Sequence, residues 1–134
     1  MNRLRGKIAH VQSNGHVSLV DVTVGPDTFA AILLEDPAAA PYLAAGREVD
    51  VLFKETEVSL AKGLASVLSL RNRMSATVRR VRRGEILSEV ELEYQGQRVI
   101  SVVTTRSVER LALQEGDAVE ALVKANEVSL SEVQ

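Results

Sequence analysis

The chain repeats itself: residues 2–61 match residues 72–131 at a constant offset of 70, with no gap. The identities include turn glycines and a closing block, namely Gly46 with Gly116 and Glu57-Val58-Ser59-Leu60 with Glu127-Val128-Ser129-Leu130. Self-similarity at a fixed spacing indicates one structural unit used twice. We therefore predict a first module over residues 1–62, a connector over residues 63–71 and a second module over residues 72–134.

The start of each copy has the hydrophobic pattern of β-strands. Residues 7–12 alternate, Asn14-Gly15 is a hairpin turn signal, and residues 17–24 are rich in β-branched side chains. Together these features predict a hairpin, in which a two-residue turn would pair His10 with Leu19.

The rest of each copy predicts three more strands and a short helix. The strands are expected over residues 28–34, 48–54 and 57–60, and the helix over residues 38–45, after Asp36-Pro37 and before Gly46. In the second copy the helix is expected over residues 107–113. This order predicts a mainly β fold of two tandem OB-like five-stranded β-barrel modules, each with one short helix.

Composition limits what such modules can do alone. Hydrophobic residues make up 46% of the chain but aromatic residues only 3%, so we expect a core of Val, Leu, Ile and Ala. A module of about 60 residues buries only about 60% of the surface of its unfolded chain. The modules are therefore expected to pack on each other or on partner subunits, and the apolar residues of the connector to pack against the barrels.

Several classes of protein are disfavoured. The chain has no cysteine, which excludes disulfides and thiolate metal sites. We find no apolar run near the roughly 18 residues of a membrane span and no leader-like start, so a cytoplasmic protein is expected. His10 and His16 do not converge, so no metal site is predicted, and no pairing of a nucleophile with a base suggests an enzyme.

A cluster of arginines opens the second copy, with Arg71, Arg73, Arg79, Arg80, Arg82 and Arg83 close in sequence. An OB-type nucleic-acid site needs aromatic platforms for base stacking, and none lies in this run. The net charge of −2 also argues against a polyanion binder. With Glu89, Glu91 and Glu93 on the adjoining strand, and with Arg79 and Arg80 expected on opposite faces, we predict a salt-bridged hairpin; a nucleic-acid binder is the alternative.

A second set of polar residues suits a small oxyanion: Ser69, Arg71 and Asn72 before the first strand of the second copy, Thr104 and Ser107 where its third strand meets its helix, and Lys124 after its fourth strand. A tetrahedral dianion is held by several hydrogen-bond donors and about two positive charges. The alternative is ordinary helix capping by Ser107 and a solvent-facing Lys124.

Four segments of the second copy resemble the molybdate-binding Mop family, also called TOBE-like domains. They are Ser69-Leu70-Arg71-Asn72, similar to the Ser-Ala-Arg-Asn signature; the segment from Thr104 to Ser107, similar to Thr-x-x-Ser; Leu113-Gln114-Glu115-Gly116; and the strand ending in Lys124-Ala125. The resemblance covers nearly all of residues 69–131, and the duplication is similar to the tandem, two-module form.

The resemblance implies OB-like barrels that bind molybdate or tungstate at module and subunit interfaces, without catalysis. The implied donors are Ser69, Arg71, Thr104, Ser107 and Lys124, supported by Asn72 and the main chain at Ala125. It also implies self-association: a homotrimer for the tandem form, with a hexamer or a dimer as alternatives. The implied role is storage, buffering or homeostasis, or else a regulatory module that responds to molybdate in a transporter or transcription-regulator system.

The first copy departs from this pattern. Leu34 and Pro37 stand where the second copy has Thr104 and Ser107, and only Lys54 matches a donor, Lys124. We therefore expect the second copy to supply the main donor set, while the first copy completes interfaces and contributes Lys54.

Overall fold

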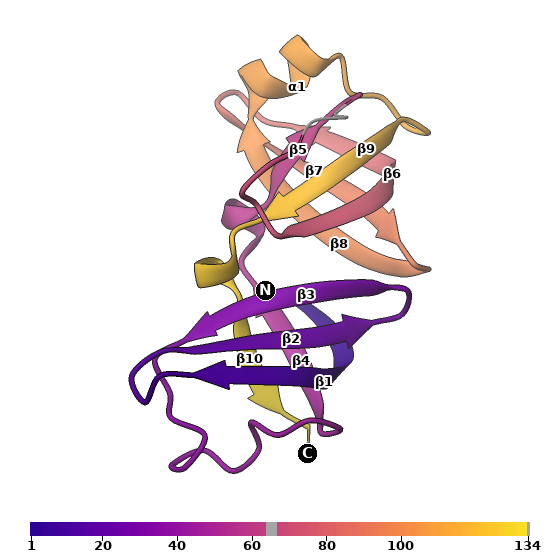
Figure 1. Cartoon of the computed structure of the whole chain (residues 1–134). Helices are drawn as coiled ribbons and strands as arrows, with labels where there is room; N and C mark the ends of the chain where they lie inside the picture. Colours follow the sequence, from indigo (N-terminus) through magenta and orange to yellow (C-terminus); the bar gives the residue numbers. More distant parts are fainter. Residues whose placement is uncertain (64–66, 134) are drawn as a thin grey trace. The chain divides into compact units, whose positions relative to one another are not determined.

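The computed structural model describes residues 1–63 and 67–133. The chain forms two compact units, one built from Met1–Phe53 with Lys124–Gln134 and the other from Lys54–Val123 (Figure 1). We call them the first unit and the second unit.

The first unit is a five-stranded antiparallel sheet in the order β10-β4-β1-β2-β3. Its strands are β1 (Asn2–Ser13), β2 (Ser18–Val24), β3 (Asp27–Leu33), β4 (Glu48–Phe53) and β10 (Ser129–Glu132), and a 3₁₀ turn, η2 (Ala125–Glu127), precedes the last.

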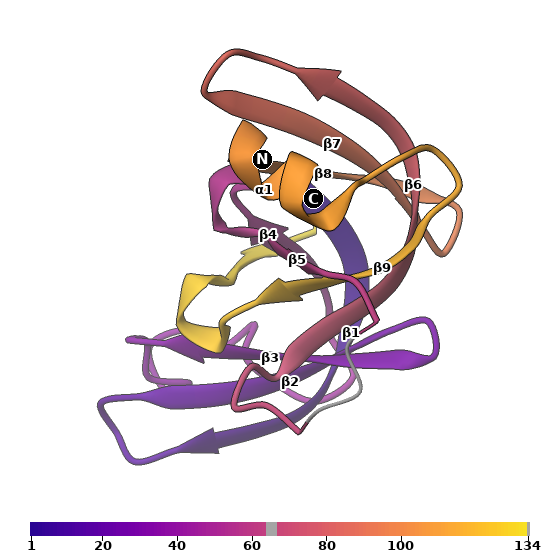
Figure 2. The ribbon, with the colours of Figure 1, turned by 90° about the horizontal axis from the view of Figure 1, so that it is seen from above.

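The second unit has the equivalent order, β5-β9-β6-β7-β8, and its strands curl around a common core (Figures 1 and 2). Its elements are η1 (Glu55–Glu57), β5 (Ser59–Ala61), β6 (Asn72–Arg83), β7 (Leu87–Tyr94), β8 (Gln97–Thr104), α1 (Thr105–Leu111) and β9 (Ala118–Val123). The predicted mainly β, OB-like architecture is confirmed.

The two sheets share one register. Asn2 pairs with Phe53 in the first unit and Asn72 with Val123 in the second, again at the offset of 70. Both long first strands carry a bulge, between Ile8 and His10 and between Val78 and Arg80. A four-residue turn, residues 14–17, pairs His10 with Asp21, so the predicted pairing of His10 with Leu19 is wrong.

The last strand of each copy is exchanged. β5 pairs with β9 of the second copy, and β10 pairs with β4 of the first. The expectation that each copy completes its own barrel is therefore wrong: the compact units do not coincide with the modules predicted over residues 1–62 and 72–134. The physical reason is that an antiparallel edge strand offers the same backbone hydrogen-bonding groups to either partner.

The helix predicted over residues 38–45 is wrong for the first copy. Residues 36–46 form turns in which Asp36 carbonyl oxygen accepts from the amides of Ala39 and Ala40, both at 2.9 Å. Pro41 has no amide hydrogen and disfavours a helical conformation at Ala40, so the first turn is not continued. In the second copy the helix runs from Thr105 to Leu111, two residues earlier than predicted.

The cores combine aliphatic side chains with the few aromatic ones. Val20, Val22 and Val49 are fully buried in the first unit, and Phe29 stacks on Phe53 with ring centroids 6.4 Å apart. In the second unit the fully buried side chains include Met74, Val90, Leu92, Tyr94 and Val99. Aromatic residues therefore contribute to a core that composition had assigned to aliphatic residues alone.

The connector is described only in part. Residues 64–66 of the segment predicted over residues 63–71 lie outside the described residues. Val67 is fully exposed and Leu68 is 36% exposed. The expectation of a packed connector is therefore wrong at Val67.

Candidate functional site

The start of α1 brings together two of the predicted donors, Thr104 and Ser107. Thr104 is the N-cap residue: its Oγ1 accepts a hydrogen bond from the Ser107 amide at 3.1 Å and donates to Ser107 Oγ at 2.8 Å. Ser107 is thus inside the first turn, and the alternative in which Ser107 caps the helix is wrong. Because its oxygen accepts the proton of Thr104, the Ser107 hydroxyl keeps its own proton to donate elsewhere.

A buried hydrogen-bond chain fixes this helix start on the sheet. Thr105 Oγ1 lies 2.8 Å from Ser88 Oγ and donates to the Gly84 carbonyl oxygen at 2.8 Å, while the Thr105 amide donates to the Ile86 carbonyl oxygen. Sequence reasoning did not assign a role to Thr105 or Ser88. The available signal was the identity of Ser18 with Ser88 across the repeat, and both serines are buried.

Ser107 also borders a small cavity of about 170 Å³ in the second unit. The other lining residues come from β5, β8, the end of α1 and the segment that follows it: Ser59, Leu60, Val103, Leu111 and Leu113. The cavity is mostly aliphatic, so Ser107 is one of two hydroxyl groups on its wall.

A second group of predicted residues lies at the start of β6. Asn72 is the first residue of this strand, fully buried, and pairs with Val123. Arg71 and Ser69 precede it and are exposed. Asn2 is buried at the equivalent place in the first unit. Burial of both asparagines at matching positions indicates that Asn72 supports the strand end, while Arg71 and Ser69 are accessible to a ligand.

The remaining predicted residues follow the fourth strand of each copy. Lys124 and Ala125 belong to the first unit, and Lys54 belongs to the second. Both lysines are exposed, and neither side chain caps the 3₁₀ turn that follows it. Ala125 is 8% exposed. The lysines are therefore available for an anion.

The antiparallel meander β6-β7-β8 keeps the two donor groups apart. Thr104 is the last residue of β8 and pairs with Leu87 at the start of β7, whereas Asn72 starts β6 and Tyr94 ends β7 at the other end of this meander. A single copy thus presents two groups of donors rather than one closed site.

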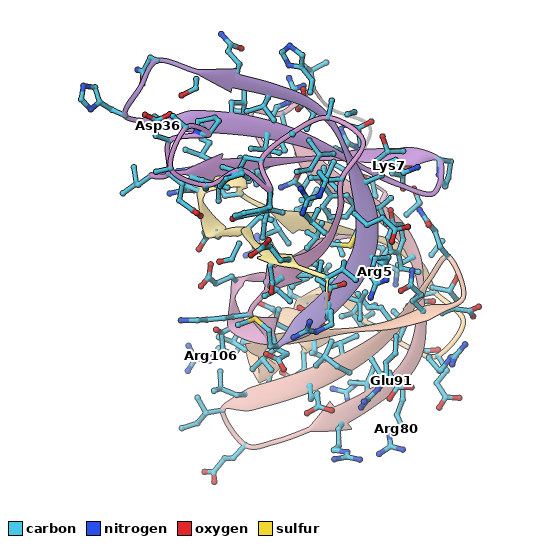
Figure 3. All side chains as sticks on the ribbon, turned by 90° about the horizontal axis from the view of Figure 1, so that it is seen from below. Arg5, Lys7, Asp36, Arg80, Glu91 and Arg106 are labelled. Carbon is cyan, nitrogen blue, oxygen red and sulfur yellow. The ribbon has the colours of Figure 1, made fainter. Side chains whose placement is uncertain are left out.

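The arginine hairpin of the second unit is paired with acidic residues. Arg79 binds Glu93 at 2.9 Å and Arg98 binds Glu91 at 3.0 Å. The bulge between Val78 and Arg80 leaves Arg79 and Arg80 both exposed, so the predicted placement on opposite faces is wrong. Arg80 and Glu91 lie beside each other on the outer face (Figure 3). The predicted salt-bridged hairpin is confirmed at Arg79.

The first unit has a different charged cluster, centred on a buried carboxylate. Asp50 is 6% exposed, and its two oxygens accept hydrogen bonds from Arg3 at 2.7 Å and Arg5 at 2.9 Å. Burial raises the pKa of Asp50, but the hydrogen bonds from Arg5 and Arg3 outweigh it and hold that pKa below its usual value. These arginines are therefore engaged with a carboxylate.

Two further findings bear on function. Within residues 1–63 and 67–133, no group of three or more His, Cys, Asp or Glu side chains is placed to hold a metal ion. In the same residues, no helix is long and apolar enough to cross a membrane.

Comparison with known proteins identifies the family. The TOBE domain model matches residues 68–130. The cytoplasmic molybdate-binding protein ModG, solved with molybdate bound, is 31% identical; the match covers 98% of this chain and 96% of that one, with a TM-score of 0.90. The molybdenum import ATP-binding proteins ModC of Brucella abortus and Brucella suis are 41% identical over 70 residues, which is 20% of their length.

These similarities define a class of small β-barrel modules that occur in tandem, as in ModG, or as part of a larger protein, as in ModC. The chain belongs to the Mop (molbindin, TOBE-like) family in its tandem, two-module form.

Proposed function

We propose that this protein is a cytoplasmic oxyanion-binding protein that holds molybdate or tungstate for storage, buffering or homeostasis. The observation that carries the proposal is the match over nearly the full length of both chains to ModG, whose structure contains molybdate. The proposed function is binding of the anion, and no catalytic role is proposed.

The groups proposed to bind the anion are the hydrogen-bond donors at the start of α1 and those around the start of β6. Thr104 and Ser107 offer hydroxyl groups, and Ser69 offers a third. Arg71 and Lys124 are exposed and supply the two positive charges that a dianion requires. The main chain at Ala125 and the buried Asn72 support this set.

A second copy of the chain is proposed to complete the site. Since the meander places Thr104 and Asn72 at its two ends, donors of both groups reach one small anion most simply across a subunit interface. A homotrimer is the proposed assembly. Mass measurement of the native protein tests it, and a monomer that still binds molybdate would contradict it.

The proposed site belongs to the second copy. The first copy has Leu34 and Pro37 in place of the two hydroxyl residues, and turns in place of α1. It also has Glu55 in place of Ala125, which brings a negative charge next to Lys54. Lys54 is therefore proposed as an accessory group.

Two experiments test the ligand. Elemental analysis of the purified protein is expected to find molybdenum or tungsten. Calorimetric titration of the protein, after removal of bound anion, is expected to give binding of molybdate and tungstate that sulfate does not displace at comparable concentration. Displacement by sulfate at equal concentration would contradict the proposed selectivity.

A regulatory role is the second candidate, favoured by the 41% identity to part of ModC. In that case molybdate would change how this chain associates with a transporter or transcription-regulator protein. Affinity capture with and without molybdate separates the two roles: a partner retained only in one condition supports regulation, and capture that does not depend on molybdate supports storage.

A further inference from the structure

The exchange of the last strands raises the question of what directs each strand to its sheet. β5 and β10 begin with the same residues, Ser59-Leu60 and Ser129-Leu130. They also use the same register, since Ser59 pairs with Leu122 and Ser129 with Leu52. Backbone hydrogen bonds and the shared leucine therefore do not distinguish the exchanged arrangement from one in which each copy keeps its own strand.

The two copies differ in charge where these strands end. Lys62 follows β5, and the equivalent residue at the offset of 70 is Glu132, at the end of β10. The residues that face them are also equivalent and also opposite in sign: Asp117 in the second unit and Arg47 in the first.

Lys62 is held by the second unit through three contacts. Its Nζ donates to Asp117 Oδ2 at 3.0 Å and to the carbonyl oxygens of Leu111 and Ala112 at 2.9 and 3.2 Å. These two carbonyl groups end α1, where the partial negative charge of the helix favours a cation. Asp117 is positioned by the Gln114 amide, which donates to the same carboxylate oxygen at 2.9 Å.

Glu132 has the corresponding partner in the first unit. Its carboxylate lies 3.9 Å from Arg47 Nη2. The first copy forms turns where the second copy has α1, so no helix end disfavours an acidic residue here.

If each copy kept its own last strand, each of these attractive contacts would be replaced by a repulsive one. Lys62 would face Arg47, and Glu132 would face Asp117 and the carbonyl end of α1. We propose that the attraction of Lys62 to Asp117 and of Glu132 to Arg47 directs each last strand to the sheet of the other copy. The same charges disfavour self-completion, the arrangement in which each copy keeps its own last strand. The inference does not depend on the proposed function.

Cysteine pairs can report the pairing, because the chain has no cysteine of its own. Antiparallel partners have Cα atoms about 4.5 to 5.5 Å apart, within the range that a disulfide bridges. The pair S129C/L52C reports exchange, and S59C/L52C reports self-completion through the same acceptor position. In the natural charge background, we expect the first pair to cross-link after refolding and the second to remain reduced.

Charge reversal then tests the cause. K62E/E132K keeps the net charge but makes both pairs repulsive in the exchanged form and attractive in the self-completed form. Each exposed pair is modest, so we expect the ratio of exchange to self-completion cross-links to fall about tenfold, or about 1.4 kcal/mol. Adding R47D/D117R restores both ion pairs and should recover most of the ratio, although the α1 carbonyl groups still oppose the reversed charge.

A matched control reverses Arg79 and Glu93, an exposed ion pair on β6 and β7, strands that pair with neither β5 nor β10. R79E/E93R should leave the ratio unchanged. An unchanged ratio in K62E/E132K, or the same fall in R79E/E93R, would overturn the proposal and leave the geometry of the turns before β5 and β10 as the cause. Peptide mapping of the oxidised protein identifies each cross-link, so poor folding of one variant does not obscure the result.

Discussion

The two copies of the repeat share a framework but differ in what they present at its ends. Their strands have equivalent order and register, and both bury an asparagine at the start of the first strand. The second copy adds α1 with two hydroxyl residues at its start, whereas the first has turns with Leu34 and Pro37 at those positions. Duplication has thus preserved the parts that form the sheet, and the copies have diverged at the parts that we propose to meet a ligand.

The charged clusters differ in the same way. In the second unit Arg73 binds Glu120 at 2.6 Å, on a partly exposed surface. In the first unit two arginines converge on the buried Asp50. The exposed Arg71 of the second copy precedes this region and remains available for an anion. Arg3, Arg5 and Arg73 are therefore engaged with carboxylates, and Arg71 is the arginine that we propose to bind the ligand.

The largest expected effect concerns the dependence of the first unit on the end of the chain. Deleting residues 129–134 removes β10 and exposes the β4 edge, while the second unit keeps all its strands. We expect the first unit to lose at least about 2 kcal/mol of stability. Hydrogen exchange followed strand by strand should show faster exchange in β1 and β4 and little change in β6 and β7. Equal loss in both units would contradict the exchanged topology.

The next effect separates the two lysines. Lys124→Ala should remove a charge-assisted hydrogen bond of about 1.5 to 3 kcal/mol and weaken molybdate binding by one to two decades. Lys54→Ala, the equivalent change in the first copy, should weaken binding by no more than about threefold. Calorimetry measures both. Equal losses would mean that the copies contribute equally to the anion.

A smaller effect compares the buried serines. Ser88→Ala removes a partner of Thr105 beneath α1, and we expect it to cost about 1 to 2 kcal/mol. Ser18 donates to the Glu35 carbonyl oxygen at 2.6 Å, and because Glu35 is exposed, water can replace the lost donor. Ser18→Ala should cost about half as much or less. Urea unfolding of both variants gives the two values, and the reverse order would show that α1 does not depend on Ser88.

The smallest effect is a dependence on pH in the first unit. Since the folded pKa of Asp50 lies below its ordinary 3.8, its ionised form stabilises the fold above about pH 4, and this contribution is lost as the pH falls through the folded pKa. Asp50→Asn should cost about 1 kcal/mol at neutral pH. The difference from the natural protein should shrink in acid, as thermal unfolding at several pH values can show. A difference that persists at low pH would assign the effect to packing.

Much of the framework was predictable because the repeat supplied an internal comparison. The glycine turns, the strand pattern at residues 7–12 and the divergence at Leu34 and Pro37 were visible in the residues. The buried alternation of β1 lies at residues 2–8, earlier than the predicted pattern. The missing helix of the first copy could have been anticipated from Pro41, whose ring and absent amide hydrogen stop a helix that Asp36-Pro37 would otherwise begin.

Other features depend on contacts that cannot be predicted from the residue pattern alone. The last strands of the two copies share their first two residues and their register, and the difference that we propose to direct the exchange is the charge at Lys62 and Glu132. The bulge at Arg79 changes the face of one side chain without a glycine to mark it. Thr104, and not Ser107, caps α1 because β8 ends at Thr104 and α1 begins at Thr105. The residue pattern placed the start of this helix at Ser107.

Calorimetric titration with molybdate tests most directly the claim that the second copy carries the site. We expect fewer strong sites per chain than modules, loss of binding in Thr104→Val/Ser107→Ala, and unchanged binding in the matched Leu34→Ala/Pro37→Ala variant. Two equal strong sites per chain, or full binding by the Thr104→Val/Ser107→Ala variant, would contradict it.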